Sequence, residues 1–208
     1  TGDVATALEY HKRSLELARE QNNRGSQCDN LRDLGADYLI QGDTNQSRKY
    51  LSEVVSLAKN HGFIWYETRS YITFAELYLI AGDLSEAEAS AMRGVDMARN
   101  LKAQELIAEA LWKKGLVSDR AGRHEEGAVT LREAIDTAQA SGHEIFLWQM
   151  YRDLGRILEA SGRTEEAAAA RTKALELVRA IAGAFKNPDT RRSFLQWTGM
   201  AGEADSPA

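Results

Sequence analysis

Residues 34–47 read Leu34-Gly35-Ala36-Asp37-Tyr38-Leu39-Ile40-Gln41-Gly42-Asp43-Thr44-Asn45-Gln46-Ser47. The second glycine of this stretch recurs every forty residues, at Gly2, Gly42, Gly82, Gly122 and Gly162. A fixed period of this length indicates five copies of one supersecondary unit. Since repeat arrays grow by stacking, the 208 residues do not require a single central core.

The segment that follows each register glycine predicts an amphipathic helix. Three positions in it keep their character from unit to unit: two are small and the one between them is branched and aliphatic. These columns are Ala7, Ser47, Ala87, Gly127 and Ala167; Leu15, Val55, Val95, Ile135 and Leu175; and Ala18, Ala58, Ala98, Ala138 and Val178. Their spacing places them on one helix face, which a neighbouring helix can approach closely.

A second helix is predicted ahead of each later register glycine. Its apolar stripe consists of Leu31, Tyr71, Leu111 and Tyr151; Leu34, Phe74, Lys114 and Leu154; Gly35, Ala75, Gly115 and Gly155; and Tyr38, Tyr78, Ser118 and Leu158. Glycine inside a helix costs about 1 kcal/mol relative to alanine, so its repetition predicts close contact with the partner helix. Lys114 and Ser118 interrupt the stripe, and we therefore expect the third unit to pack less well.

Turn signals define the helix ends. The register glycines suit the left-handed residue that ends a helix, and Gly62 and Gly142 provide the other stops. Asp43 and Asp83 are expected to cap the following helices, and Thr164 is the candidate cap in the last unit. The predicted helices are residues 4–21, 25–41, 44–60, 65–81, 84–100, 105–121, 124–141, 145–161 and 164–183.

Two regions follow from this register. Residues 1–186 form the predicted repeat array, with units that start near residues 2, 42, 82, 122 and 162 and an incomplete first unit. Residues 187–208 are predicted to be a capping helix and a disordered tail, in which Asn187 caps the helix and Pro188 occupies its first turn. Phe194, Leu195 and Trp197 are expected to cover the last exposed groove of the array. Because residues 4–21 read as the second helix of a unit, we expect the chain to be a fragment of a longer array.

Leu34-Gly35 with Tyr38, Leu154-Gly155, and the small residues Ala87 and Ala167 resemble the tetratricopeptide repeat (TPR). The resemblance covers residues 1 to about 183, although the family's usual unit has about 34 residues. Units of forty residues are similar to those of kinesin light chains, spindle-orientation adaptors and the C-terminal arrays of bacterial multidomain signalling ATPases and transcription activators. The resemblance implies an all-α, right-handed α-solenoid of antiparallel helix pairs, with about nine repeat helices and a short capping helix.

The resemblance also implies that the first helix of each unit lines a concave binding surface. On that surface we predict the partner-binding residues Asp29, Arg32, Arg69, Glu76, Glu109, Trp112, Lys113, Gln149, Arg152 and Arg156. Arg152 and Arg156 lie one turn apart and can hold a carboxylate or a phosphate, and Trp112 can supply an aromatic anchor. The alternative is a solvated arginine face with Trp112 packed between units. Trp65, Trp148 and Trp197 are expected to be packing residues.

Composition and missing motifs bound the function. The net charge is −5 and the pI about 5.5, so neither nucleic acid nor an anionic membrane is an expected partner. The single cysteine, Cys28, fits a reducing, cytoplasmic location. The four histidines form no i, i+4 pair and no phosphate-binding loop occurs, so the sequence predicts no metal, no cofactor and no catalytic residue.

Two functions remain after these exclusions. The first is a non-catalytic protein–protein interaction scaffold, in which the concave face binds a peptide, a helix or a partner domain. The second is a ligand- or peptide-sensing array that controls an attached ATPase, cyclase or DNA-binding domain. Mixed charge among the predicted partner-binding residues favours the first. Self-association through residues 4–21 or through the C-terminal segment is a further alternative.

Overall fold

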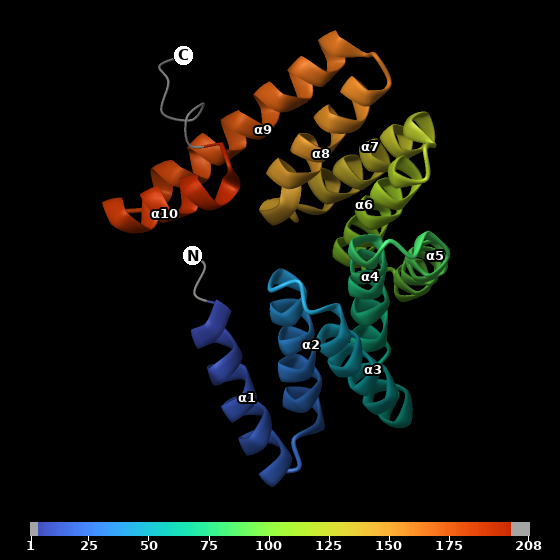
Figure 1. Cartoon of the computed structure of the whole chain (residues 1–208), viewed down its shortest axis with the longest axis vertical. Coiled ribbons are helices and arrows are strands. Elements are labelled where there is room, and N and C mark those ends of the chain that lie inside the picture. Colours follow the sequence, from blue (N-terminus) through green and yellow to red (C-terminus); the bar gives the residue numbers. More distant parts are fainter. Residues whose placement is uncertain (1–3, 201–208) are drawn as a thin grey trace.

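The computed structural model describes residues 4–200, and over this range the protein is an all-α solenoid of antiparallel helices. The helices follow a curved path, from α1 at the lower left of Figure 1 to α9 and α10 at the upper left. Their bounds are α1 (Val4–Glu20), α2 (Arg24–Ile40), α3 (Thr44–His61), α4 (Ile64–Ala81), α5 (Leu84–Leu101), α6 (Gln104–Arg120), α7 (His124–Ser141), α8 (Leu147–Ala160), α9 (Thr164–Ala184) and α10 (Pro188–Thr198). The register position Gly2 and the predicted tail at residues 201–208 lie outside the described residues.

The helix boundaries predicted from the turn signals hold to within two residues. The helix predicted at residues 145–161 differs from the observed structure at its start, because a 3₁₀ turn (Glu144–Phe146) precedes α8. We call α2, α4, α6 and α8 the inner helices, since their residues line the groove described below, and α1, α3, α5, α7 and α9 the outer helices. Inner and outer helices alternate along the chain, as the repeat predicts.

The register glycines end the inner helices in the predicted conformation. Gly42, Gly82, Gly122 and Gly162 have φ values between +76° and +81°, in the left-handed region that glycine adopts without strain. The four turns therefore share one backbone geometry. Each turn reverses the chain in the same way, and the forty-residue period becomes a regular stacking of helix pairs.

The N-terminal caps are partly as predicted. The carboxylates of Asp43 and Asp83 accept hydrogen bonds from backbone N–H groups three residues further on, at 3.0 and 3.2 Å. The prediction for Thr164 is wrong, because this residue already lies in α9 and the preceding Arg163 makes no side-chain cap bond. The guanidinium of Arg163 instead binds Glu166 at 2.7 Å, a carboxylate in the first turn of the helix.

The glycines inside the helices lie where two helices touch. A Cβ on Gly115 would be 3.1 Å from the carbonyl oxygen of Gly127, and a Cβ on Gly127 would be 2.8 Å from that of Gly115. The backbones of α6 and α7 are thus in direct contact. The expected weakness of the third unit is wrong, since Ser118 is buried and its hydroxyl donates to Glu126 at 3.1 Å.

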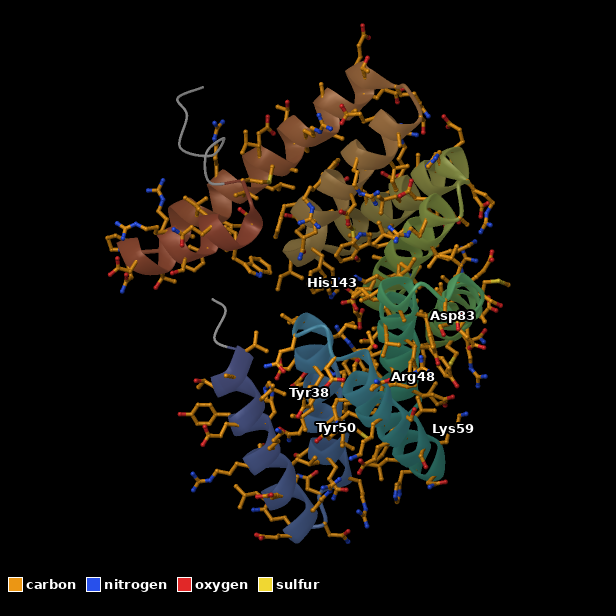
Figure 2. All side chains as sticks on the ribbon, in the orientation of Figure 1. Tyr38, Arg48, Tyr50, Lys59, Asp83 and His143 are labelled. Atoms are coloured by element: carbon orange, nitrogen blue, oxygen red, sulfur yellow. The ribbon has the colours of Figure 1, made fainter. Side chains whose placement is uncertain are left out.

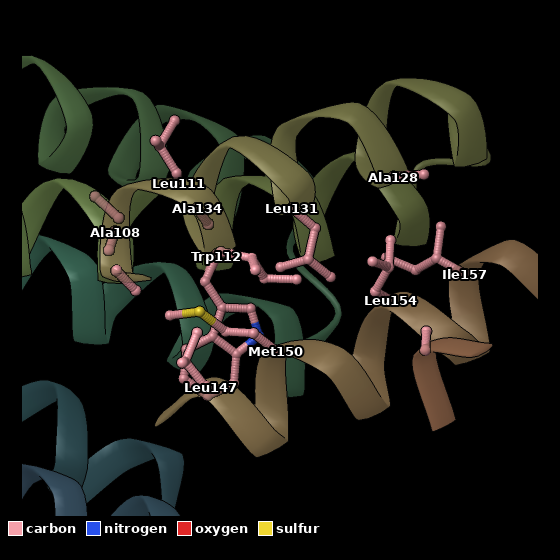
Figure 3. Close-up of a cluster of buried hydrophobic side chains, with 14 of the residues drawn as sticks. Ala108, Leu111, Trp112, Ala128, Leu131, Ala134, Leu147, Met150, Leu154 and Ile157 are labelled. Atoms are coloured by element: carbon pink, nitrogen blue, oxygen red, sulfur yellow. The ribbon is translucent and has the colours of Figure 1, made fainter. Parts of the chain in front are cut away.

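The largest cluster of buried apolar side chains joins α6, α7 and α8 (Figure 3). Leu111, Leu131 and Ile157 are fully buried in it, and the indole of Trp112 lies among Leu147 and its neighbours. Complete burial of a leucine-sized side chain contributes roughly 1.5–3 kcal/mol. The largest group of buried apolar side chains therefore lies at the junction of α6, α7 and α8.

The C-terminal helix α10 packs against α9. Asn187 caps it by accepting hydrogen bonds from two backbone N–H groups, and Pro188 is its first residue. Leu195 is buried against α9, and Phe194 packs beside it. Trp197 differs from the prediction: its ring packs edge-on against Trp148, but the side chain remains 59% exposed.

Ion pairs connect successive outer helices. Arg19 binds Glu53 (2.5 Å), and the equivalent positions two units further on pair again between Arg99 and Glu133 (3.0 Å). The corresponding positions between α3 and α5 are both basic, Lys59 and Arg93. Each of these two side chains contacts Glu67 of α4 instead, at 3.8 and 3.4 Å. Lys59 is labelled in Figure 2, below the turn that carries Asp83. One carboxylate thus serves two cations at this junction.

Among residues 4–200, none of the helices combines the length and apolar character that crossing a bilayer requires.

Candidate binding groove

Residues of the inner helices line a groove that contains two adjoining cavities. The first has a volume of about 360 Å³ and is lined from α2 to α8; the second, of about 450 Å³, is lined from α4 to α8. Five residues line both cavities: Glu76, Ile80, Trp112, Lys113 and Gln149. The two cavities therefore form one continuous groove.

Paired charges cross the groove from helix to helix. Nη2 of Arg69 lies 3.1 Å from both carboxylate oxygens of Glu109, which occupies the same register position in the next unit. Lys113 binds Glu76 at 2.9 Å. Burial raises the pKa of the Glu109 carboxyl above its ordinary range, although Arg69 and Lys113 act in the opposite direction. These pairs hold α4 and α6 side by side across the groove.

Trp112 forms the floor of the groove. Its side chain is only 6% exposed, and its Nε1–H donates to Oδ2 of the buried Asp153 at 2.9 Å. The ammonium of Lys113 lies 3.9 Å from the indole ring centre, and the ring of Phe146 packs beside it. Trp112 therefore packs between units, as the alternative interpretation expects, while the surface that remains lines both cavities.

The α8 end of the groove carries two arginines supported by buried acids. Nη1 of Arg156 binds Asp119 of α6 at 2.8 Å. Nη2 of Arg152 lies 3.2 Å from Asp153, and its guanidinium lies over the ring of Trp148, 5.3 Å from the ring centre. The arginines are thus neither freely solvated nor fully neutralised, because each engages only part of its five N–H donors.

Apolar side chains complete the groove. Ile40 and Ile80 line the first cavity although they are 71% and 54% exposed, and Phe146 reaches it from the 3₁₀ turn. The sequence columns did not include these three residues. Ile80 lies four residues, one helical turn, after the predicted Glu76, and Ile40 occupies the same position forty residues earlier, so an extension of this register by one turn would have found both. The position of Phe146 depends on the 3₁₀ turn, which the pattern did not indicate.

Two buried polar atoms that face this region lack hydrogen-bond partners within residues 4–200. They are Nε of Arg32 and Oε1 of Gln149. Buried donors and acceptors usually have a partner, in the protein or in water. Both residues line the first cavity. Neither atom is accessible to solvent, so water or a ligand would satisfy them only after the two side chains reorient.

The structure brings nine of the ten predicted binding residues to the groove. They are Arg32, Arg69, Glu76, Glu109, Trp112, Lys113, Gln149, Arg152 and Arg156. Asp29 is the exception, because it lines neither cavity and its carboxylate accepts a hydrogen bond from the hydroxyl of Tyr66 at 3.0 Å. Burial and this bond raise the pKa of Tyr66 to about 12.

The single cysteine lies outside the groove. Cys28 of α2 is fully buried in a cluster with apolar side chains of α1, α2 and α3. Burial raises the pKa of its thiol to about 11. A protonated, inaccessible thiol is a poor nucleophile. Over the described range, residues 4–200, histidine, cysteine, aspartate and glutamate side chains do not come together in any group of three or more that could hold a metal ion.

Comparisons with known proteins support this architecture. No protein-family model matches the chain. Regulatory protein AfsR of Streptomyces griseus is 27% identical over 114 residues, which are 55% of this chain but only 12% of that protein. The chain thus spans a small part of this curated relative.

Solved structures show the fold more fully. BtubC (BKLC) from P. vanneervenii matches with a TM-score of 0.69 and 15% identity, over 99% of this chain and 88% of that one. The nearly identical TPR-like repeats of a Podosopora anserina protein match with a TM-score of 0.59 and 18% identity, over 86% of this chain and 87% of that one. The resemblance inferred from the sequence is therefore confirmed: the fold is a TPR-like helical repeat.

Proposed function

We propose that this TPR-like scaffold binds a protein segment along the groove of its inner helices. The carrying observation is the composition of that groove, in which exposed Ile40 and Ile80 adjoin paired charges and two unsatisfied polar atoms. An apolar patch excludes water around a bound side chain, and fixed polar groups set the orientation of the chain. Ile40 and Ile80 differ from the other exposed apolar residues because they line one cavity together, where they offer an apolar contact to a bound side chain.

The unsatisfied atoms favour a polypeptide over an apolar small molecule. Nε–H of Arg32 needs an acceptor and Oε1 of Gln149 needs a donor. Each peptide group offers both. An extended segment laid across α2 to α8 presents such groups repeatedly, so its backbone provides affinity and its side chains enter the cavities.

A peptide-selection experiment tests the proposal. A displayed random peptide library is selected against the whole chain, and the affinities of recovered peptides are measured by calorimetry. Ile80→Glu places a charge in the apolar part of the groove without disturbing a buried residue, and we expect it to weaken binding at least about tenfold. Val129→Glu is the matched control, because Val129 is 61% exposed on the outer helix α7.

The pair of variants decides the outcome. Loss of affinity in Ile80→Glu with retention in Val129→Glu supports binding in the groove. Equal affinity of both variants for every recovered peptide would show that the partner surface lies elsewhere, and the proposal would be wrong.

A regulatory array is the second candidate function. The observation that favours it is the 27% identity to Regulatory protein AfsR over 114 residues. Under this alternative, peptide binding changes the curvature of the solenoid and thereby acts on an attached domain. Small-angle X-ray scattering with and without a recovered peptide distinguishes the two functions. A changed radius of gyration supports regulation, whereas an unchanged one supports a passive scaffold. In either case we expect a reducing, cytoplasmic location.

A further inference from the structure

Three arginines converge on the second cavity of the groove. Arg120 of α6 and Arg152 and Arg156 of α8 line this volume of about 450 Å³. The side chains of Arg152 and Arg156 are 46% and 59% exposed. Arg120 is also exposed, and it makes no ion pair with any of residues 4–200. The cavity therefore presents three guanidinium groups to solvent from two facing helices.

Buried carboxylates position two of these arginines from beneath. Asp119 contacts Arg156, and Asp153 contacts Arg152. Both aspartates are less than one-tenth exposed. The two aspartates orient the guanidinium groups. Each carboxylate binds the N–H groups on one edge of the planar guanidinium, which leaves the remaining N–H donors directed outward.

Each buried carboxylate has a second donor. Nε1–H of Trp112 donates to Asp153 at 2.9 Å. Nδ1 of His124 lies 2.7 Å from Asp119, and since a carboxylate only accepts, this ring nitrogen is the donor. An arginine that turns toward a ligand does not leave its aspartate without a hydrogen bond. The arrangement therefore permits anion binding without exposing an unpaired buried charge.

The charges of the cavity are unequally exposed. Its cations are Lys113, Arg120, Arg152 and Arg156, and its acids are Glu76, Asp119 and Asp153. Glu76, whose side chain is 43% exposed, pairs with the largely buried Lys113 at 2.9 Å, and the two aspartates lie below the surface. The three exposed arginines therefore outnumber the one exposed acid. The solvent-facing charge is consequently positive, in a chain whose net charge is −5. This contrast identifies the cavity as the anion-attracting part of the groove.

We infer that the second cavity binds a phosphoryl group carried by the segment that occupies the groove; this inference rests on the proposed function. A phosphorylated side chain has a charge near −2 and three acceptor oxygens, which three guanidinium forks can bind together. A single carboxylate has one negative charge and two oxygens, and it would leave part of the arginine array without a partner. The site is thus expected to distinguish phosphoserine from aspartate.

The experiment uses small probes and the whole chain. Arginine Nε–H and Trp112 Nε1–H resonances are followed by two-dimensional NMR at constant ionic strength. The probes are inorganic phosphate, N-acetyl-phosphoserine amide, N-acetyl-aspartate amide and sodium chloride. We expect both phosphoryl probes to shift the resonances of Arg120, Arg152 and Arg156 saturably, with the phosphoserine probe about tenfold tighter than the aspartate probe. If inorganic phosphate binds as tightly as the phosphoserine probe, the site takes free phosphate, and the link to a bound segment is wrong.

Variants locate the binding. Arg120→Gln removes a cation that touches no buried acid, so the fold is retained, and Arg152→Gln tests one of the positioned arginines. Each should weaken binding of the phosphoserine probe about tenfold. Arg191→Gln, on α10 away from the groove, removes the same charge and should leave the affinity unchanged. Equal affinity in all three variants, equal binding of the aspartate probe, or shifts that chloride reproduces would each overturn the inference.

The outcome is separable from that of the proposed function. If Ile80→Glu abolishes binding of library peptides while the phosphoserine probe leaves the arginine resonances unchanged, the groove binds segments and only the phosphoryl inference fails. If library peptides bind Ile80→Glu unchanged, the proposed function fails, whatever the arginine resonances do.

Discussion

Replacing Gly127 with alanine tests the direct backbone contact between α6 and α7. In an isolated helix the change would be favourable by about 1 kcal/mol. Here the new Cβ would lie 2.8 Å from the carbonyl oxygen of Gly115 and 3.1 Å from the backbone nitrogen of Asp119. Because both atoms belong to a helix backbone, neither can rotate away and the two helices must separate. Overpacking of this kind costs about 1–3 kcal/mol, so we expect a net loss of about 1–2 kcal/mol in the free energy of unfolding.

Gly183→Ala is the matched control, since Gly183 is helical and a Cβ there meets no atom within 4 Å. It should stabilise the protein by about 0.5 kcal/mol. Urea unfolding is followed by far-UV circular dichroism, and the midpoint and slope are compared. As repeat arrays need not unfold in one step, hydrogen exchange of α6 and α7 amides supplies a local measure. A midpoint for Gly127→Ala that equals or exceeds that of Gly183→Ala would contradict the close contact of these helices.

Three further predictions follow from the buried groups. Trp112→Phe removes the donor to Asp153 and should lower the free energy of unfolding by about 1–3 kcal/mol, measured by urea titration; an unchanged value would mean that the hydrogen bond is not formed. Cys28 should react with a disulfide reagent only after unfolding, because the thiol is buried with a pKa of about 11; rapid reaction of the native protein would argue against this environment. Tyr66 has a pKa of about 12 in the folded state, above the ordinary value near 10 that applies to the unfolded chain. Between these two pH values the unfolded state loses the Tyr66 proton while the folded state keeps it. The contribution of Tyr66 to the free energy of unfolding is therefore lost as pH rises from about 10 to about 12. Tyr66→Phe should therefore make the urea midpoint fall less steeply between pH 10 and 12, roughly the interval between the unfolded and folded pKa values, and an equally steep fall would refute the shift.

The fold was predictable because packing constrains the same positions in every unit. A residue at the position of Ala87 or Ala167 must be small wherever an inner helix approaches, and a turn such as that at Gly82 needs a left-handed residue. Lys114 and Ser118 predicted poorer packing of the third unit than the structure has. A polar residue was counted as a loss of apolar contact, whereas a buried hydroxyl with a partner and a glycine pair at the interface compensate for it.

The groove was less predictable, because its properties depend on pairs between helices. Arg156 and Asp119 are 37 residues apart, as are Lys113 and Glu76, and these contacts follow from how the units stack. The sequence places the arginines on the correct face, but it does not show that a buried acid holds each of them. The pair Arg69 and Glu109 carried a usable signal, since opposite charges at one register position in adjacent units favour contact.

The shared geometry of the four glycine turns also bears on how such an array gains or loses units. An in-frame deletion of residues 82–121 would join Ala81 to Gly122, whose φ of +79° matches that of Gly82. The deletion would remove Arg93 and set Lys59 against Glu133, replacing two like charges with opposite ones. Loss or duplication of forty residues is thus a small evolutionary step for the scaffold, while the groove is reassembled from a different set of side chains.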